Sequence, residues 1–151
     1  MAIQIDPAQV ERDLEVPSDY AGLIEAASEH PRRYRFYADA AAETAELYEL
    51  RKIALKSVES QSFVDFKFEP EKPLSDKHTE KLVDSDPGVI KARKRVAAAK
   101  RAYDTMVSIR DSMRSRKDMM EMVSKFYLRE NAILADRALQ AKFDNTDTDK
   151  D

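Results

Sequence analysis

From Pro87 to about Phe143 the chain contains no further proline and, after Gly88, no glycine. Within this stretch apolar residues recur every seven positions, at Ala92, Ala99, Met106, Met113, Met120, Tyr127 and Leu134. A seven-residue apolar repeat is typical of a helix in a coiled coil or bundle. As one helix the stretch would reach about 85 Å, whereas a compact chain of this size has a radius of gyration of roughly 15 Å. The helix therefore either breaks, at 112–118 where apolar residues are sparse, or packs against other chains.

Glycine is scarce throughout, with two residues in 151 against roughly ten expected from average usage of about 7%. Without glycine, phosphate-cradling loops lack the positive φ angles that they need, so glycine-rich nucleotide-binding loops are excluded. The absence of cysteine excludes disulfides, thiolate zinc sites and cysteine nucleophiles. No apolar run approaches the roughly 20 residues of a membrane span, and the N-terminus lacks the pattern of a secretory signal. These features predict a cytoplasmic protein.

A second amphipathic helix is predicted over 31–60, because apolar residues recur there at three- and four-residue steps. Pro31 suits the first position of that helix, with His30 as a cap residue. A short helix is expected before it, from Ser18 to about Ser28, and another from Ser75 through Val83. Asp86 and Pro87 are typical of the N-cap and first turn of the last helix.

The residues Val64 to Glu69 alternate between apolar and polar, which predicts a short strand ended by Pro70. The expected fold class is therefore mainly α: two long amphipathic helices, short helices and one short strand or extended segment, assembling into a helical homo-oligomer. The domain organisation follows the composition. We expect an acidic flexible arm at 1–19, a helical domain at 20–143 with a linker or strand segment at 61–86, and a disordered acidic tail at 144–151.

Charge is strongly segregated along the chain. Residues 91–117 carry ten bases and two acids, a net charge of +8, whereas the remainder carries 16 bases and 27 acids, or −11. Charged residues can simply solvate the exposed face of a helix, but such a face normally mixes glutamate with lysine for pairing along the helix. The segment 91–117 has no glutamate, and a surface of one sign suits a polyanion.

A second basic cluster combines Arg32, Arg33 and Arg35 with Tyr34, Phe36 and Tyr37. Such a composition can bind phosphates while it stacks bases, although Tyr34 and Tyr37 also belong to the predicted core stripe. The methionines between Met106 and Met122 fit either an adaptable groove or, at heptad spacing, a helical seam. The predicted oligomer seam consists of Met106, Met113, Met120, Val123, Tyr127 and Leu134.

No catalytic constellation is visible in the sequence. His30 and His78 lack the spacing of a metal site, and His78 is expected on the surface. Serine, histidine and aspartate occur without the glycine frame of a nucleophile elbow. We therefore predict that the chain is not an enzyme and uses no cofactor and no metal.

The segment Glu49 to Lys56, ELRKIALK, together with the block from Val83 through Ile133, resembles the UvsY recombination mediators of T-even-type bacteriophages. The first motif resembles the basic helical segment of that family, and DSDPGVIK resembles the start of its long C-terminal helix. Ser115 and Arg116, with Met120 and Val123, resemble its Ser-Arg signature. Val58 stands where the family has a further base, and Lys117 stands where it often has glycine.

The resemblance implies a recombination mediator in phage homologous recombination, replication and repair. Such a protein forms a ring-shaped homo-oligomer, binds single-stranded DNA and helps a RecA-like recombinase displace single-strand-binding protein, in this case in the host cell cytoplasm. The motif match and the charge segregation together indicate these nucleic-acid-binding residues: Arg51, Lys52, Lys56, Lys91, Arg93, Lys94, Arg95, Lys100 and Arg101. The alternative is a structural or scaffolding coiled-coil oligomer, a virion or assembly component whose basic face pairs with the acidic arm of a neighbouring subunit. A regulatory binder of double-stranded DNA is a third interpretation, against which the lack of a helix-turn-helix pattern counts.

Overall fold

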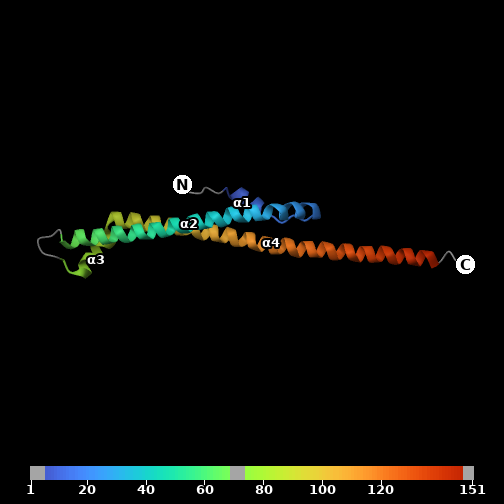
Figure 1. Ribbon diagram of the computed structural model, residues 1–151. Coiled ribbons are helices and arrows are strands. Elements are labelled where there is room, and N and C mark those ends of the chain that lie inside the picture. Colours follow the sequence, from blue (N-terminus) through green and yellow to red (C-terminus); the bar gives the residue numbers. More distant parts are fainter. Residues whose placement is uncertain (1–5, 69–73, 148–151) are drawn as a thin grey trace. The chain divides into compact units, whose positions relative to one another are not determined.

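The structure is a computed structural model that describes the backbone of residues 6–68 and 74–147, and their side chains up to residue 138 and at Gln140. Its elements are the helices α1 (Pro7–Leu14), α2 (Tyr20–Phe68), α3 (Asp76–Ser85) and α4 (Pro87–Asp147) (Figure 1). The predicted mainly α fold with two long helices and additional short ones is confirmed. The chain divides into two compact units, unit 1 with residues 1–34 and 111–151, and unit 2 with residues 35–110.

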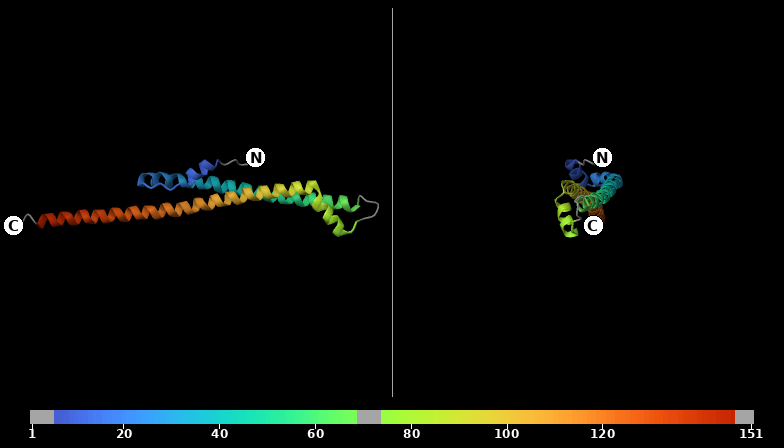
Figure 2. Two further views of the ribbon diagram at one scale, coloured as in Figure 1. Left: turned by 180° about the vertical axis from the view of Figure 1, so that it is seen from behind. Right: turned by 90° about the vertical axis from the view of Figure 1, so that its left-hand side faces the viewer.

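In unit 2, the second part of α2 and the first part of α4 lie side by side (Figure 2). The two helices are antiparallel: residues later in α2 contact residues earlier in the chain on the other side of the pair. The Tyr48 ring stacks on Tyr103 with centroids 6.2 Å apart, and further along α2 the Ser62 hydroxyl donates to the Asp86 carboxylate at 2.5 Å. The buried apolar residues of unit 2 include Val83 of α3 and, on the helix pair, Tyr37, Ala40, Ala41, Val89, Ala99 and Met106.

Unit 1 contains α1, the beginning of α2 and α4 from Asp111 onward. Its core is formed by Leu23 and Ala26 of α2 with Met120 of α4, against which Val16, Val123 and Tyr127 pack. Met113 is also fully buried. After Tyr127 the described side chains of α4 are all exposed, so this part of the helix has no packing partner within the unit.

The predicted start of the first long helix at Pro31 is wrong, because α2 runs through this proline as one element. A proline inside a helix removes one backbone hydrogen bond and crowds the preceding turn. Buried side chains on both sides, from Leu23 and Ala26 before it to Tyr37 and Ala40 after it, favour the continuous helix. His30 is consequently not a cap residue: it lies inside α2 with 7% of its surface exposed.

The predicted strand is also wrong, because the residues from Val64 to Phe68 form the last turns of α2, and the described residues contain no strand. The alternation of apolar residues there overlaps a helical stripe in which Ser62, Phe63 and Phe66 are at least partly buried. Glu69 and Pro70, which were expected to end the strand, lie outside the described residues. Of the two alternatives for the last helix, the break at 112–118 is wrong, because α4 is continuous through that segment.

Two predicted helix starts are confirmed. Ser75 is the N-cap of α3, and Asp86 precedes α4 and accepts a hydrogen bond from the Gly88 amide at 2.6 Å. Of the segment predicted as a flexible arm, residues 7–14 instead form α1, which is capped by Asp6. Of the predicted tail, residues 144–147 belong to α4, and the remainder lies outside the described residues. Among the described helices, none has an apolar stretch long enough to cross a membrane.

Candidate nucleic-acid interface

All nine predicted nucleic-acid-binding residues belong to unit 2. Arg51, Lys52 and Lys56 lie on α2, and the other six lie on α4 between Lys91 and Arg101. The antiparallel pairing brings the two groups to the same level, because Tyr48 contacts Tyr103 at one end and Glu59 contacts Arg93 at the other. Two segments that are far apart in the sequence thus place their bases along one stretch of the helix pair.

Three of these bases are neutralised by carboxylates. The Lys52 ammonium lies 2.9 Å from both oxygens of Glu49 and 5.2 Å from the centre of the Tyr48 ring. The Lys100 ammonium lies 2.7 Å from Asp104. Hydrogen bonding to Glu49 raises the pKa of Lys52, and hydrogen bonding to Asp104 raises the pKa of Lys100. These side chains meet a ligand phosphate only in competition with their own partners.

The third neutralised base, Arg93, connects three helices. Its Nη2 atom lies 2.9 Å from Oε1 of Glu59 on α2 and 2.8 Å from Oδ1 of Asp84 on α3. Hydrogen bonds to Asp84 and Glu59 raise the pKa of Arg93. It borders a cavity of about 630 Å³ that these two carboxylates share with Phe63 and Glu80. The arrangement makes Arg93 a structural contact between α2, α3 and α4.

The six other bases are exposed and have no carboxylate partner within the described residues. We call them the open cations: Arg51, Lys56, Lys91, Lys94, Arg95 and Arg101. On α4, Lys94 and Arg95 follow Lys91 at three and four residues, and Arg101 follows Lys94 at seven, so these four share one side of the helix. Arg93 and Lys100, also seven apart, lie on another side. The bases of α4 that are paired with carboxylates thus lie on one side of the helix, and the open cations of α4 lie on another.

Sequence reasoning missed the stacked pair Tyr48 and Tyr103. Their rings are nearly parallel, at 7°, and both side chains are partly buried. Both residues occupy seam positions of their helices: Tyr103 follows Val89 and Val96 at seven-residue steps, and Tyr48 follows Ala41. That shared position was the available signal for their contact.

The aromatic and basic cluster at 32–37 does not form one surface. Tyr37 is 1% exposed and Phe36 is 56% exposed. The Arg33 guanidinium lies 2.8 Å from Asp13 of α1, and the Arg35 guanidinium lies 3.7 Å from Asp39. The interpretation of Tyr37 as a core residue is therefore confirmed, whereas Tyr34 is only partly buried.

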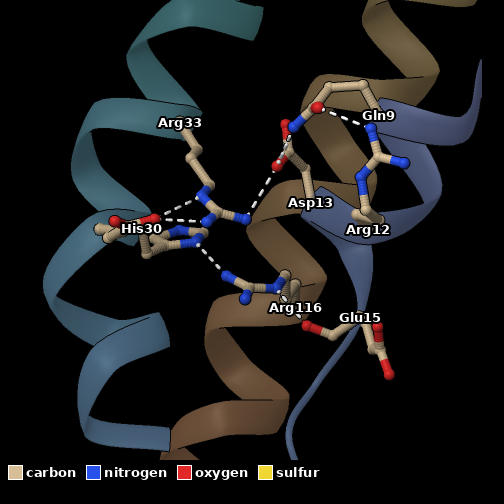
Figure 3. Close-up of polar contacts among 8 residues, drawn as sticks. Gln9, Arg12, Asp13, Glu15, His30, Arg33 and Arg116 are labelled. Atoms are coloured by element: carbon tan, nitrogen blue, oxygen red, sulfur yellow. Dashed lines mark hydrogen bonds and ion pairs between the residues drawn. The ribbon is translucent and has the colours of Figure 1, made fainter. Parts of the chain in front are cut away.

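A polar cluster in unit 1 connects α1 to α2 and α4 (Figure 3). Arg116 of α4 is 4% exposed, and its Nε donates to the Glu15 carbonyl oxygen at 2.9 Å. Arg33 of α2 binds the carboxylate of Asp13, which also accepts a hydrogen bond from Gln9 at 2.9 Å. Both arginines therefore hold the acidic segment that was expected to be loose.

His30 completes this cluster, and its Nδ1 atom lies 3.3 Å from Nη1 of Arg116. Burial lowers the pKa of His30, and the positive charges of Arg116 and Lys117 lower it further. Both effects favour the neutral form of the imidazole. His78, by contrast, is exposed on α3, as predicted.

The predicted oligomer seam divides between the two units. Met106 in unit 2 and Met113 and Met120 in unit 1 are buried within this single chain. Val123 and Tyr127 pack against the core of unit 1, whereas Leu134 is 59% exposed. A second set of large apolar residues on α4 is also exposed, at three-, four- and seven-residue spacing. We call it the outer stripe: Met119, Met122, Phe126 and Ile133.

No protein-family model, curated protein or solved structure matches the chain. Within the described residues, no group of three or more histidine, cysteine, aspartate or glutamate side chains is arranged to hold a metal ion. The arrangement in unit 2 therefore has to be interpreted from its own chemistry. An exposed set of guanidinium and ammonium groups without partners can bind phosphates.

Proposed function

We propose that the chain binds single-stranded DNA through the open cations of unit 2 and acts as a recombination mediator without enzymatic activity. The observation that carries the proposal is the separation of paired from unpaired bases. Four unpaired bases gather on one side of α4, at the level where α2 contributes Arg51 and Lys56. The mediator role, in which a RecA-like recombinase is loaded onto DNA covered by single-strand-binding protein, rests on the sequence resemblance described above.

The spacing of the open cations suits a flexible polyanion. Lys91 and Arg101 are separated by about 15 Å of helix, at 1.5 Å per residue, so one strand can contact several of these bases in succession. Phosphate contacts release counterions, which supplies affinity without sequence preference. A mediator needs this kind of contact, because it has to act on any sequence.

Weak contacts of this kind gain strength when several subunits act on one strand. We propose that the chain forms a homo-oligomer, ring-shaped as the resemblance implies, through α4 beyond Asp111. The outer stripe supports this proposal, since its side chains are between 44% and 68% exposed. Helices that lack packing partners are marginal in water, and the described side chains from Leu128 onward have none within unit 1.

Charge supports the same division of α4. Residues 87–110 carry seven bases and one acid, whereas residues 111–138 carry six bases and five acids. The nearly neutral part can pack against its own copies without strong repulsion, while the basic part repels other copies and attracts a polyanion. One helix thus combines a segment suited to assembly with a segment suited to DNA.

The salt dependence of oligo(dT) binding tests the DNA-binding proposal. Each phosphate contact contributes roughly 0.7 to the slope of log affinity against log salt for a single strand. Replacing Lys91, Lys94 and Arg95 with alanine should therefore flatten the slope by about 2. The matched control is the double variant Lys52→Ala and Lys100→Ala, which removes bases that are already paired and should change the slope by less than 1.

A slope near zero in the wild-type chain would contradict the proposal, as would equal effects of the two sets of substitutions. An intact oligomer without DNA binding would instead support the scaffolding alternative. The mediator role has a separate test, in which a RecA-like recombinase assembles on DNA covered by single-strand-binding protein from the same source. The wild-type chain should accelerate assembly, and the triple variant should not.

A further inference from the structure

Unit 1 contains a cavity of about 450 Å³ between α2 and α4. Its lining consists of an imidazole, a proline ring, a phenol, two bases and one acid, contributed by His30, Pro31, Tyr34, Arg114, Lys117 and Asp118. A second cavity of about 400 Å³ shares His30, Pro31 and Lys117 with it and continues past Met120 to Leu128. This size is within the range of small-molecule sites, which span roughly 300 to 1,000 Å³.

The aromatic side of the cavity comes from two neighbouring residues of α2. The His30 and Tyr34 rings have centroids 6.1 Å apart and are tilted by 32°. Tyr34 is partly buried, so part of its ring faces the cavity that it lines. Aromatic rings in such positions are the surfaces on which unpaired nucleobases stack. Pro31 lies between His30 and Tyr34 in the sequence. It has no N–H to donate to the carbonyl oxygen of Ala27, and Ala27 is one of the residues that line the second cavity.

The charged side of the cavity comes from α4. Arg114 is exposed and has no carboxylate partner among the described residues, and the Lys117 ammonium lies 3.4 Å from Glu121. Asp118 is the acid of this lining, which therefore holds one more base than acid. The neighbouring Arg116 adds a further positive charge; the pKa of His30 is lowered first by burial and then by the charges of Arg116 and Lys117.

We infer that this cavity binds one unstacked nucleotide of a single strand, with its base against Tyr34 and its phosphate near Arg114 and Lys117. The inference rests on the proposed binding of single-stranded DNA and adds a base-contacting site in unit 1 to the cations of unit 2. It also gives a role to Tyr34, the member of the aromatic and basic cluster that lines this cavity. A free nucleotide has the same chemistry, and the experiment distinguishes the two sources.

The two histidines of the chain allow a direct test by NMR titration of the imidazole protons between about pH 5 and 8. A bound phosphate near Lys117 stabilises the imidazolium form of His30, so oligo(dT) should raise the pKa of His30. His78, exposed on α3 of unit 2, is the internal control and should shift less. Thymidine 5′-monophosphate and inorganic phosphate are titrated separately at the same phosphate concentration and should have smaller effects on His30 than the strand has.

Matched variants connect the shift to the cavity. Arg114→Ala should reduce the shift of His30 at least two-fold, whereas Arg129→Ala, which removes an exposed base on the same helix outside the cavity, should leave it unchanged. Tyr34→Leu should weaken binding of oligo(dT) several-fold and leave binding of an abasic strand of equal length unchanged. Circular dichroism checks that each variant remains helical. If Tyr34→Leu altered the local packing, it would weaken binding of the abasic strand as well, so the comparison of the two strands separates this effect from the loss of base contact.

The outcomes separate this inference from the proposed function. If oligo(dT) binds but the His30 pKa does not move, or if Arg114→Ala and Arg129→Ala behave alike, the nucleotide site is wrong and binding by unit 2 stands. If the free nucleotide shifts His30 and the strand does not, the strand is excluded as the ligand. If oligo(dT) does not bind at all, the proposed function fails together with the inference.

Discussion

Arg116 donates from Nη1 to Nδ1 of His30 across 3.3 Å, and both side chains are less than a tenth exposed. An arginine has no acceptor, so His30 can take part only as the neutral tautomer that carries its proton on Nε2. The contact couples the protonation of one residue on α2 to the anchoring of α1, because the same guanidinium also holds the Glu15 carbonyl oxygen.

Lowering the pH should therefore destabilise unit 1. The pKa of His30 is lowered from 6.5 in the folded chain, so below about pH 6.5 the unfolded chain binds a proton that the folded chain does not. Stability is fully present above pH 6.5 and is lost as the pH falls towards the folded pKa, at up to about 1.4 kcal/mol per pH unit. Denaturant unfolding between pH 5 and 8 measures this loss. His30→Gln keeps a hydrogen-bond acceptor for Arg116 but cannot be protonated, so it should remove the part of the pH dependence that comes from His30. An unchanged pH profile in that variant would assign the pH dependence to other groups.

The side chain of Arg116 should contribute to stability through its hydrogen bonds more than through its charge. Arg116→Ala leaves the Glu15 carbonyl and His30 without their donor and should cost roughly 2 kcal/mol, in line with hydrogen bonds made by charged groups. Arg116→Met fills a similar volume without a buried charge and should cost less. Thermal and denaturant unfolding compare the two variants. Equal losses would contradict this expectation and would show that the volume of the side chain contributes nothing.

Disrupting the outer stripe should dissociate the proposed oligomer. Glutamate at Met122 and Phe126 places charges in the proposed contact between copies, so the mass in solution should fall to that of the 17.3 kDa chain. Leu50→Glu is the matched control, because Leu50 is an exposed apolar residue of similar accessibility on α2, at 55%. Light scattering or sedimentation measures the masses. Dissociation by the control as well, or a wild-type monomer, would refute the stripe as the contact.

The heptad repeat predicted the long C-terminal helix well, because periodicity reports a continuous helical face. The same reasoning failed where two patterns overlapped. The alternation from Val64 to Phe68 also fits a helix whose partly buried side chains recur at Phe63 and Phe66. In the structure these residues continue α2 as its last turns. Pro31 was expected to start an element, although packing on both sides outweighs one missing hydrogen bond.

For the candidate site, charge and position along the chain were visible in the sequence, but pairing was not. Arg93 and Lys94 are adjacent bases in the sequence, yet Arg93 is held by Glu59 and Asp84 whereas Lys94 is open. The partners come from α2 and α3, so only the packing of the three helices decides which bases are neutralised. The cavity beside His30 is equally invisible in the sequence, since its two walls lie 80 or more residues apart.

The antiparallel pairing in unit 2 has a further consequence. Apolar heptads alone permit two helices to slide by seven residues, because every slip restores a similar seam. Three contacts of different chemistry prohibit such a slip: the stacked rings of Tyr48 and Tyr103, the ion pair of Glu59 with Arg93, and the hydrogen bond from Ser62 to Asp86. The register of the helix pair is therefore fixed, and the interval from Arg51 on α2 to Arg95 on α4 is constant in the folded chain.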